Sequence, residues 1–369
     1  MNIYILNDLI LSKNQGINTT TEKIKYCASG HKVLRAKNIL DNKIDESDLV
    51  YIDDNTYNTS NDNYKPKIDD VLYTNIGSQF GSACVLNTND YFITWNILRL
   101  VPNKKLISPL YLSYLLNSNK ERLRNLNSSS TMPFVSGNIL CKEKFNIHSL
   151  EEQQHIVNTI GTIDDKIENN EKLINKIEEF LLLNFIKLDK CEGLVFSDIF
   201  NCFNGGTFKS TDYAEKSEYK LITIKNIDGN GFNTDNATYI PKMDKYAKYK
   251  LKIGDILLTM TGAYLGRSGI VDEENCYLNQ RVLKISGISK SFLYCFLKYN
   301  QNEIFNLGKG SAQPNLSLSD LNCFPVNYDI NDINSFCEND KYIDLIINLK
   351  IETRKLKTLK AQFLTKFFN

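Results

Sequence analysis

The chain has 369 residues, of which 42% are hydrophobic, so it is long enough for two domains with packed cores and too apolar to be disordered throughout. It has no run of 18 apolar residues and no basic-then-apolar N-terminus, so we expect neither a membrane-spanning nor an exported protein. Nine cysteines without a Cys-x-x-Cys pair predict reduced thiols in the cytoplasm, three scattered histidines leave little for a metal site, and a net charge of +1 leaves nucleic-acid binding open.

The first lobe, residues 1–148, is predicted to have a mixed α/β fold. Short strands are expected at Asp70–Thr74 and Trp95–Leu100, and a helix is expected at Leu110–Leu116. A Gly-x-x-x-Gly segment, Gly77–Gly81, follows the first of these strands and resembles a phosphate-binding loop. Because no Gly-Lys-Ser/Thr follows at the spacing of a P-loop, we predict that its glycines provide the positive φ of tight turns.

Residues 149–190 are predicted to form a long helix of the coiled-coil type. One polar residue, Asn170, interrupts its apolar seam, and such a buried polar position commonly fixes the register of two paired helices. An ordinary core helix is the alternative interpretation. The seam follows the alternating four- and three-residue spacing of a coiled coil: Ile156, Ile160, Ile163, Ile167, Ile174, Ile177 and Leu181.

The second lobe, residues 191–328, repeats the sequence pattern of the first. Tyr64–Gly81 matches Tyr249–Gly266 without a gap, at an offset of 185 residues. Further matches keep the same order along the chain, among them Lys37–Ile39 with Lys225–Ile227. We therefore predict a tandem duplication, in which the equivalents of the first lobe's elements are two strands and a helix at Asp255–Thr259, Gln280–Ile285 and Phe292–Leu297.

Residues 329–369 are predicted to form a second long helix. Its seam has Glu352 in the position that Asn170 has in the first helix. Antiparallel pairing of the two helices would bring these two residues together, and crosslinking of cysteines introduced at both positions tests that pairing. The predicted seam consists of Leu345, Leu349, Leu356, Leu359 and Phe363.

Side chains suited to reading DNA gather on the predicted loops of both lobes. In the major groove arginine suits guanine, asparagine and glutamine suit adenine, and lysine and hydroxyl groups position the backbone. The first helix is acidic and the lobes are mildly basic, so DNA is expected to meet the lobes. For each residue alone, an exposed side chain without a role is the alternative. The candidate contacts are Arg35, Lys37, Asn38, Asn75, Ser78, Gln79, Asn96 and Arg99 in the first lobe, and Lys209, Lys225, Asn226, Thr261, Tyr264, Arg267, Asn279, Gln280, Arg281 and Lys309 in the second.

Enzymatic motifs are missing from the sequence. It has no Asn/Asp-Pro-Pro-Tyr/Phe for methyl transfer to an amino group, no glycine-rich cofactor loop and no His-Glu-x-x-His. The acidic run Asp272-Glu273-Glu274 has the ligand type for a metal ion, but we predict that it is a solvated acidic turn.

In its duplicated plan the chain resembles the specificity (S) subunit of Type I restriction-modification systems. The first matching motif is Gly-Asp-Ile-Leu-Leu-Thr-Met-Thr-Gly at Gly254–Gly262, which is echoed at Asp69–Gly81. The second is a Ser/Thr-x-Pro stretch before each long helix, at Ser130–Ser136 and Ser311–Ser317. The third is Leu-Glu-Glu-Gln at Leu150–Gln153, which opens the first helix. The resemblance covers nearly the whole chain.

The resemblance implies an α/β protein with two tandem target-recognition domains, each followed by a long helix, and pairing of these helices as an antiparallel coiled coil. It implies a subunit without catalytic activity, in which each lobe reads half of a bipartite double-stranded DNA site and the helices set the gap between the halves. Two DNA adenine methyltransferase (modification) subunits are expected as partners, together with restriction/translocase subunits. S-adenosylmethionine, ATP and magnesium are expected on those partners, and no cofactor or metal is expected here.

Three other interpretations remain open at this stage. An antiparallel coiled-coil scaffold that binds proteins would show no salt-dependent DNA binding. A nuclease or methyltransferase with divergent motifs would be active without a partner. A specificity subunit of another phage-defence methylation system would share all the features described above.

Overall fold

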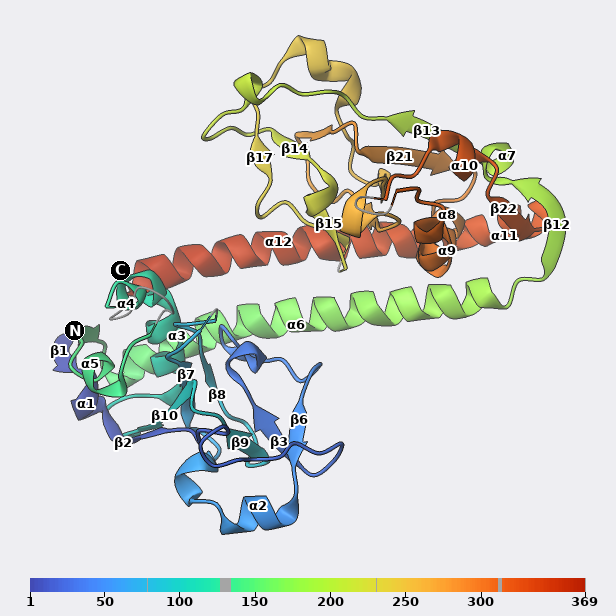
Figure 1. The fold of residues 1–369 in the computed structure, drawn as a ribbon. Coiled ribbons are helices and arrows are strands. Elements are labelled where there is room, and N and C mark those ends of the chain that lie inside the picture. Colours follow the sequence, from blue (N-terminus) through green and yellow to red (C-terminus); the bar gives the residue numbers. More distant parts are fainter. Residues whose placement is uncertain (78, 127–133, 230, 311–313, 369) are drawn as a thin grey trace. The chain divides into compact units, whose positions relative to one another are not determined.

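The computed structural model describes residues 1–369 except 78, 127–133, 230, 311–313 and 369. The chain forms two compact units, of which the first comprises Met1–Asp165 with Lys357–Asn369 and the second comprises Lys166–Leu356. Each unit contains one lobe together with a stretch of each long helix, α6 (Leu150–Ile186) and α12 (Asp340–Phe368) (Figure 1).

The first lobe is built from short strands arranged in small sheets, as predicted for a mixed α/β fold. A four-stranded sheet in the order β2-β10-β7-β8 and a three-stranded sheet in the order β6-β3-β9 form its body. Its helices and strands are β1 (Asn2–Ile5), α1 (Leu6–Leu9), β2 (Ile10–Gln15), β3 (His31–Leu34), β4 (Ile39–Leu40), β5 (Lys43–Ile44), β6 (Val50–Ile52), α2 (Asp54–Thr59), β7 (Val71–Thr74), β8 (Ala83–Val85), β9 (Tyr91–Ile93), β10 (Ile97–Pro102), α3 (Pro109–Ser118), α4 (Lys120–Arg124), α5 (Gly137–Leu140) and β11 (Lys144–Ile147).

The second lobe repeats this topology strand for strand. Its four-stranded sheet has the order β13-β21-β18-β19 and its three-stranded sheet the order β17-β14-β20. The predicted tandem duplication is therefore confirmed at the level of topology. The helices and strands are β12 (Lys190–Val195), α7 (Phe196–Ile199), β13 (Phe200–Asn204), β14 (Lys220–Ile222), β15 (Ile227–Asp228), β16 (Gly231–Phe232), β17 (Thr238–Tyr239), β18 (Ile256–Thr259), β19 (Ser268–Ile270), β20 (Cys276–Leu278), β21 (Val282–Gly287), α8 (Lys290–Tyr299), α9 (Gln301–Asn306), α10 (Leu318–Asn322), β22 (Pro325–Tyr328) and α11 (Ile330–Phe336).

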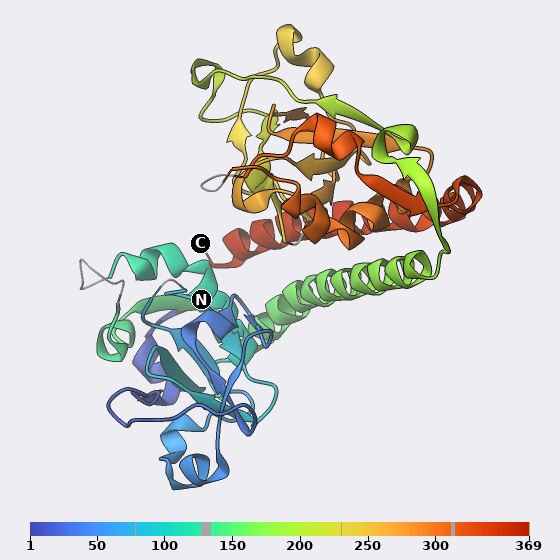
Figure 2. The same ribbon diagram turned by 45° about the vertical axis from the view of Figure 1, so that its right-hand side comes forward.

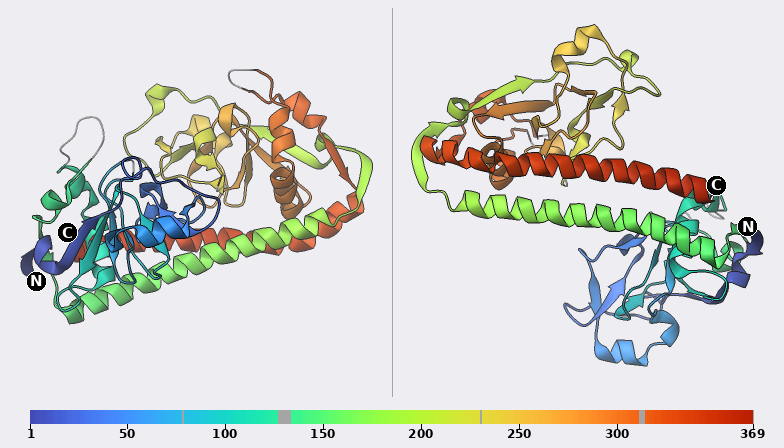
Figure 3. Two further views of the ribbon diagram at one scale, coloured as in Figure 1. Left: turned by 60° about the horizontal axis from the view of Figure 1, so that its bottom comes forward. Right: turned by 180° about the vertical axis from the view of Figure 1, so that it is seen from behind.

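Each lobe has one half beside the long helices and one half away from them. In the first unit α3 and the four-stranded sheet lie near α6, and α2 lies at the far end (Figures 1 and 2). In the second unit α8 and the four-stranded sheet lie near α12, whereas β14 and β17 lie farther out (Figures 1 and 3). The largest apolar cluster of each unit lies in the near half and includes side chains of the long helices.

The seam predicted for the first helix is buried along its whole length, as a coiled-coil seam should be. In the first unit Ile156 and Ile160 belong to the main core, against which Phe363 and Phe367 of α12 pack. In the second unit the seam continues into that unit's core, where Phe180 of α6 stacks edge-on against Tyr342 of α12 at 5.2 Å between ring centroids.

The seam predicted for the second helix is wrong in part. Leu349 is buried, but Leu345 is 40% exposed and Leu359 is 41% exposed. Ile343 and Ile346 are fully buried instead, because this side of α12 packs into the core of the second lobe. Helix α12 packs against the second lobe as well as against α6. The seven-residue pattern predicts only the contact with the other helix.

The glycine loops have the predicted role. Gly77 and Gly81 have φ values of 97° and 93°, and their counterparts Gly262 and Gly266 have 67° and 79°. All four lie in the left-handed region that favours glycine, so an added Cβ would strain the backbone. The loops are tight turns that close each four-stranded sheet at one end.

Two predicted strands begin later than expected. They were expected to start at Trp95 and Gln280, but β10 starts at Ile97 and β21 starts at Val282. The two residues before each strand form a turn in which the N–H of Trp95 bonds to Ile17 and that of Gln280 bonds to Gly206, outside the ladder of the strand. The division into lobes at 1–148 and 191–328 and helices at 149–190 and 329–369 stays a prediction.

Candidate nucleic-acid interface

In the first lobe two loops meet at one end of the four-stranded sheet. Strand β7 ends at Thr74, and its antiparallel neighbour β10 begins opposite that residue, since Ile97 pairs with Thr74. The loop after β7 and the turn before β10 therefore emerge side by side. The N–H of Asn75 donates to the main-chain oxygen of Asn96 at 3.2 Å and ties the two together.

The second lobe builds the same junction. Here Val282 at the start of β21 pairs with Thr259 at the end of β18. The N–H of Met260 donates to the main-chain oxygen of Arg281 at 3.1 Å, and this bond is the counterpart of the one between Asn75 and Asn96. The two lobes therefore present the same pair of loops on the same backbone frame.

A buried threonine fixes the glycine loop in each lobe. The Thr74 hydroxyl donates to the main-chain oxygen of Ser82 at 3.1 Å, and the Thr259 hydroxyl donates to that of Arg267 at 3.1 Å. The N–H groups of Ser82 and Arg267 in turn donate to the two hydroxyls at 3.0 and 3.1 Å. This cross-bonding ties the two ends of each loop together, so the backbone frame of the loop is set before a ligand arrives.

The segments before the long helices cover the glycine loops. In the first lobe the N–H of Val135 donates to the main-chain oxygen of Asn75 at 3.1 Å. In the second lobe the N–H of Gly262 donates to the main-chain oxygen of Pro314 at 2.8 Å. The described parts of Ser130–Ser136 and Ser311–Ser317 thus brace the loops, while residues 130–133 and 311–313 lie outside the described residues.

Two of the predicted contacts, Asn38 and Asn226, are buried in the body of the lobes. Each closes a short 3-10 turn, in which its side-chain oxygen accepts a hydrogen bond from the N–H of Arg35 or of Thr223 at 2.9 Å. The Asn38 side chain also donates to the main-chain oxygen of Asp45 at 2.9 Å. With these bonds both asparagines stabilise the backbone, and we remove them from the DNA-contact set.

Asn75 and Arg99 are buried as well. The Asn75 amide donates to the main-chain oxygen of Val135 at 3.1 Å. The Arg99 Nε donates to Asp70 Oδ2 at 2.6 Å, inside the lobe. Both side chains therefore hold the frame, and we remove them from the DNA-contact set too.

Three predicted cations, the half-buried Arg35 and the exposed Lys37 and Lys309, lie beside carboxylates. Arg35 donates to the main-chain oxygen of Asp48 at 2.7 Å, and Lys37 pairs with the Asp48 carboxylate. Lys309 pairs with Asp320 at 2.8 Å and holds the pKa of that carboxyl below its usual range. Exposed pairs of this kind contribute little to stability, so a phosphate can compete for the cation. Two further predicted cations, Lys209 and Lys225, are exposed on the second lobe.

At the loop tip of the second lobe the predicted residues come together. The Arg267 guanidinium lies over the ring of Tyr264 at 4.8 Å, a cation–π contact that fixes the orientation of both. In the neighbouring turn Gln280 and Arg281 are exposed, and the Gln280 amide oxygen accepts from the hydroxyl of Thr207 at 2.6 Å. Asn279 of the same turn is half-buried and accepts from the N–H of Arg281 at 3.2 Å.

The remaining predicted residues lie at the same two loops. Gln79 and Asn96 of the first lobe and Thr261 of the second are half-buried. The side-chain oxygens of Asn96 and Thr261 are buried and form no hydrogen bond among the described residues. Ser78 lies outside the described residues.

The acidic run in the second lobe is not the solvated turn that the sequence predicted. Asp272 is buried, and it pairs with Arg354 of α12. Glu273 pairs with Lys220 at 2.7 Å and also with Arg354. Burial raises the pKa of Asp272 above its ordinary value, although the neighbouring cation opposes the rise. The run is an ion-pair cluster that joins the lobe to the helix within the second unit.

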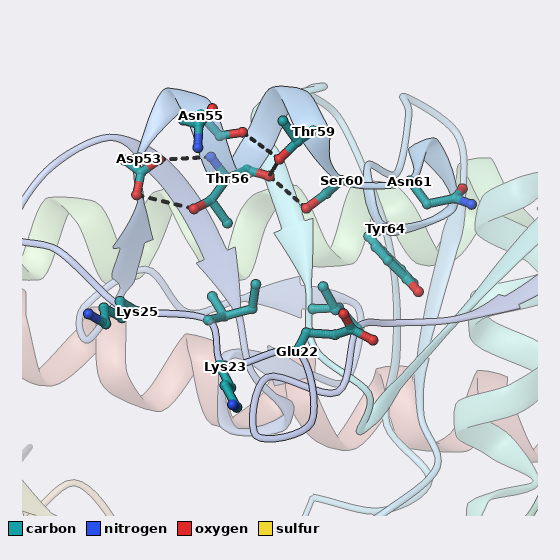
Figure 4. Close-up of a pocket in the computed structure, with 12 residues that line it drawn as sticks. Glu22, Lys23, Lys25, Asp53, Asn55, Thr56, Thr59, Ser60, Asn61 and Tyr64 are labelled. Carbon is teal, nitrogen blue, oxygen red and sulfur yellow. Dashed lines mark hydrogen bonds between the residues drawn. The ribbon is translucent and has the colours of Figure 1, made fainter.

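A hollow of about 540 Å³ lies in the far half of the first lobe, lined by α2 and the segment around Lys23 (Figure 4). Two of the hydroxyls that line it are bonded to the backbone of α2: Thr59 donates to the main-chain oxygen of Asn55 at 2.7 Å, and Ser60 donates to that of Thr56 at 2.6 Å. None of the predicted contacts lines it. The hollow is therefore not part of the candidate interface.

Disulfides, metal clusters and membrane-spanning helices are not found among the described residues. All nine cysteines are free, and no cluster of three or more histidine, cysteine or acidic residues with metal-binding geometry occurs among the described residues. Within the same residues no helix is long and apolar enough to cross a membrane.

One exposed residue of the interface, Trp95, is absent from the predicted set. It lies in the turn before β10, next to Asn96. The 185-residue offset that relates the lobes carries Gln280 onto it, so the repeat held the signal that would have marked it.

The sequence and fold were compared with those of known proteins. The family model for the Type I restriction modification DNA specificity domain matches the chain twice, over residues 5–179 and 195–329. The Type I restriction enzyme MjaVIII specificity subunit of Methanocaldococcus jannaschii is 24% identical over 304 residues, which are 66% of this chain and 70% of that protein. The putative type I restriction enzyme MjaX specificity subunit of the same organism is 29% identical over 195 residues, which are 48% of this chain and 43% of that protein.

Among solved structures, the Type-I restriction-modification system S subunit from M. genitalium has the same fold. It aligns with a TM-score of 0.64 over 100% of this chain and 96% of that chain, at 17% sequence identity. The predicted fold class, two tandem α/β domains each followed by a long helix, is confirmed.

Proposed function

This chain belongs to the family of Type I restriction-modification DNA specificity subunits, and we propose on that premise that it reads a bipartite DNA site, with one half-site for each lobe. The half-site of each lobe meets the paired loops at the end of the four-stranded sheet. The observation that carries this proposal is the shared frame with different tips. The backbone bonds from Asn75 to Asn96 and from Met260 to Arg281 correspond, whereas the exposed side chains around them differ.

A protein that recognises two different half-sites needs the same loop backbone in both lobes and different exposed side chains on those loops. The rigid loops supply position, since their threonine cross-bonds hold them without a ligand. The exposed tips supply the chemistry of base recognition, such as the amide of Gln280 and the guanidinium of Arg281 in the second lobe. Exposed lysines such as Lys209 and Lys225 supply phosphate contacts.

The long helices have a different role in this proposal. They set the gap between the half-sites, and their charged outer faces bind two DNA adenine methyltransferase subunits, which restriction/translocase subunits join. S-adenosylmethionine, ATP and magnesium belong to those partners, and this chain performs no chemistry of its own. The complex works on DNA in the cytoplasm.

The test is a methylome measured by long-read sequencing. Cells express this chain together with its candidate methyltransferase subunit, and each protein alone is the control. A split motif with a fixed gap, modified only when both proteins are present, is the expected result. Modification by this chain alone would make it an enzyme, and a stable complex without any motif would favour the scaffold.

Assignment of one lobe to each half-site has its own test. Replacement of Gln280 and Arg281 by alanine removes the exposed tip of one turn in the second lobe. We expect discrimination to fall by about 1–3 kcal/mol for each lost base contact in one half-site, with the other half-site unchanged. Equal relaxation of both half-sites would contradict the assignment. The matched control is Lys252→Ala, because that side chain is exposed on the second lobe and precedes β18, at the strand end opposite the one that carries the candidate loops.

A further inference from the structure

Trp95 is an exposed indole at the candidate interface of the first lobe. It is the only tryptophan among the 369 residues, and 43% of its surface is accessible. An exposed tryptophan needs an explanation more than an exposed leucine does, because its large apolar face gains much from being covered.

The turn that holds this indole is rigid. The N–H of Trp95 donates to the main-chain oxygen of Ile17 at 2.8 Å, and the N–H of Ile97 donates to that of Thr94 at 2.9 Å. The Gln15 side chain donates to the main-chain oxygen of Trp95 from the other side. With both its N–H and its carbonyl bonded, the backbone of Trp95 is fixed at the exposed end of the sheet.

The second lobe has the same turn with a different residue at this place. The N–H of Gln280 donates to the main-chain oxygen of Gly206 at 2.8 Å, and the N–H of Val282 donates to that of Asn279 at 3.0 Å. These bonds correspond to those of Trp95 and Ile97. Trp95 therefore occupies the place in the first lobe that Gln280 occupies in the second.

The glycine loops show the reverse exchange. The residue at the loop position shared by the two lobes is Gln79 in the first lobe and Tyr264 in the second. Each lobe thus carries one amide and one aromatic side chain at two equivalent positions, but in opposite order. The loops that hold them emerge from the same end of one sheet in each lobe. Exchange of the amide and the aromatic side chain between the two positions is expected if the two lobes recognise different bases through one amide contact and one aromatic contact each.

We propose that Trp95 is a base-contacting residue that determines the specificity of the first lobe. Its indole packs against the apolar surface of a nucleobase, either the methyl edge of a thymine or the face of a base that leaves the stack. The inference rests on the proposed function, because it assumes that the loop ends face DNA. It adds a residue and a ligand group to the first half-site.

The sole tryptophan makes the first experiment direct. The full chain is labelled with 7-azatryptophan, assembled with its unlabelled methyltransferase partner, and titrated with acrylamide as a fluorescence quencher. A target duplex should protect the label from quenching, whereas a duplex with a scrambled first half-site should protect it less. The same complex without DNA should be quenched freely, because the indole is exposed.

The second experiment uses variants and modified DNA. Trp95→Gln, which installs the residue of the second lobe, should weaken binding to the target by about 5- to 150-fold, and Trp95→Phe should recover part of that loss. Leu11→Gln is the control, since Leu11 is a more exposed apolar residue on β2 of the same lobe. Deoxyuridine in place of each thymine of the first half-site tests the methyl edge, and 2-aminopurine fluorescence tests an unstacked base.

The outcomes separate the inference from the function on which it rests. Absence of sequence-specific DNA binding by the wild-type complex would reject the proposed function. Specific binding with an indole that stays fully quenchable would overturn the inference alone, as would a Trp95→Gln variant that weakens all DNA equally or that only loses its methyltransferase partner. Sensitivity to deoxyuridine or to 2-aminopurine, lost in Trp95→Gln, would establish the base contact and its kind.

Discussion

The equivalent four-stranded sheets of the two lobes each contain an ion pair at the same position, but the two pairs differ in distance and in burial. In the first lobe Arg99 on β10 meets Asp70, with 2.6 Å between Nε and Oδ2 and side chains that are only 10% and 5% exposed. In the second lobe the equivalent pair is Lys284 and Asp255, at 3.7 Å and with side chains 30% and 19% exposed. The positions correspond through the same offset of 185 residues that relates the loops.

The difference shows how a duplicated frame can diverge without a change of fold. Arg99 also donates to the main-chain oxygen of Asp62 at 3.1 Å, so one guanidinium satisfies two groups inside the lobe. A lysine has no fork of donors, and Lys284 lies instead over the ring of Phe203 at 5.3 Å. The first lobe depends on a buried ion pair, and the second uses a looser pair with an aromatic contact.

The largest effect that we predict comes from loss of the ion pair between Arg99 and Asp70. Arg99→Met keeps the length of the side chain and leaves Asp70 buried without its cation. We expect the free energy of unfolding to fall by about 3–5 kcal/mol. Lys284→Met at the equivalent place should cost about 0–1 kcal/mol, because water reaches the pair. Hydrogen exchange of β7 and β10, compared with β18 and β21, measures the two lobes separately in one protein.

Separate measurement is needed because a chain with two compact units does not unfold in a single two-state step. The expected signature of Arg99→Met is lost protection confined to the first lobe. Equal losses from both variants would show that burial of the pair does not decide its contribution.

The lobes also differ in how they hold the long helices. In the first unit Asp164 of α6 accepts from Tyr114 at 2.8 Å and pairs with Lys360 of α12 at 2.5 Å. In the second unit Arg354 of α12 reaches the buried Asp272 and also donates to the Thr234 hydroxyl at 3.1 Å. One anchor thus depends on a carboxylate of the helix, and the other depends on a carboxylate of the lobe.

The second prediction tests this contrast through pH. Arg354→Met removes the attraction that opposes burial of the Asp272 carboxylate, and it should cost about 1–3 kcal/mol at neutral pH. The folded pKa of Asp272 lies above its unfolded value, so the folded state binds the proton more tightly and stability falls as the pH rises between the two values. Loss of the cation raises the folded pKa further and widens that window.

The destabilisation by Arg354→Met should therefore fade as the pH falls toward the ordinary pKa of a carboxyl group. Hydrogen exchange of β14 and β20 at several pH values measures it. Lys360→Met is the control, since its carboxylate partner Asp164 shows no comparable burial. A cost for Arg354→Met that is independent of pH would mean that packing, and not charge, anchors the lobe.

The duplication was predictable from the sequence because short segments of the two lobes have matching residues at matching spacing. The matching of Tyr64–Gly81 with Tyr249–Gly266 anticipated two sheets of one topology, and the glycine spacing anticipated the positive φ angles. Such features depend on the backbone within a few residues, so a linear sequence carries them.

The side-chain roles were less predictable because burial is decided by distant segments. Asn38 and Arg99 have the chemistry of base readers, yet one closes a turn and the other neutralises Asp70, a residue 29 positions away. Trp95 shows the opposite failure, since its strand-like sequence context predicts a place in the sheet, whereas the residue lies in an exposed turn. Its exposure follows from hydrogen bonds with Ile17 and Gln15, which no local pattern records.

The smallest predicted effect concerns the polar interruption of the helix seam in the second unit. Asn170 is 3% exposed, and its amide donates to Glu352 Oε2 at 2.8 Å, so the two seam interruptions meet within this unit. A double-mutant cycle with Asn170→Ala and Glu352→Ala should give a coupling of about 0.5–1 kcal/mol. The value is low because the Glu352 side chain is 44% exposed and also pairs with Lys166 at 3.5 Å.

The same cycle with Asp164 and Lys360 in the first unit should give a larger coupling, because both of those side chains are less exposed than Glu352. If the role of Asn170 is to fix the register of the helices, Asn170→Leu should keep or raise stability while it allows the helices to shift, since an apolar residue removes the preference for one partner. Crosslinking between cysteines at 170 and 352 measures that register in the otherwise unchanged chain, and crosslinking at neighbouring positions after a second substitution, Glu352→Leu, detects a shift. A single register in the doubly apolar seam would mean that packing against the lobes aligns the helices. The polar pair of Asn170 and Glu352 would then contribute only modestly to stability.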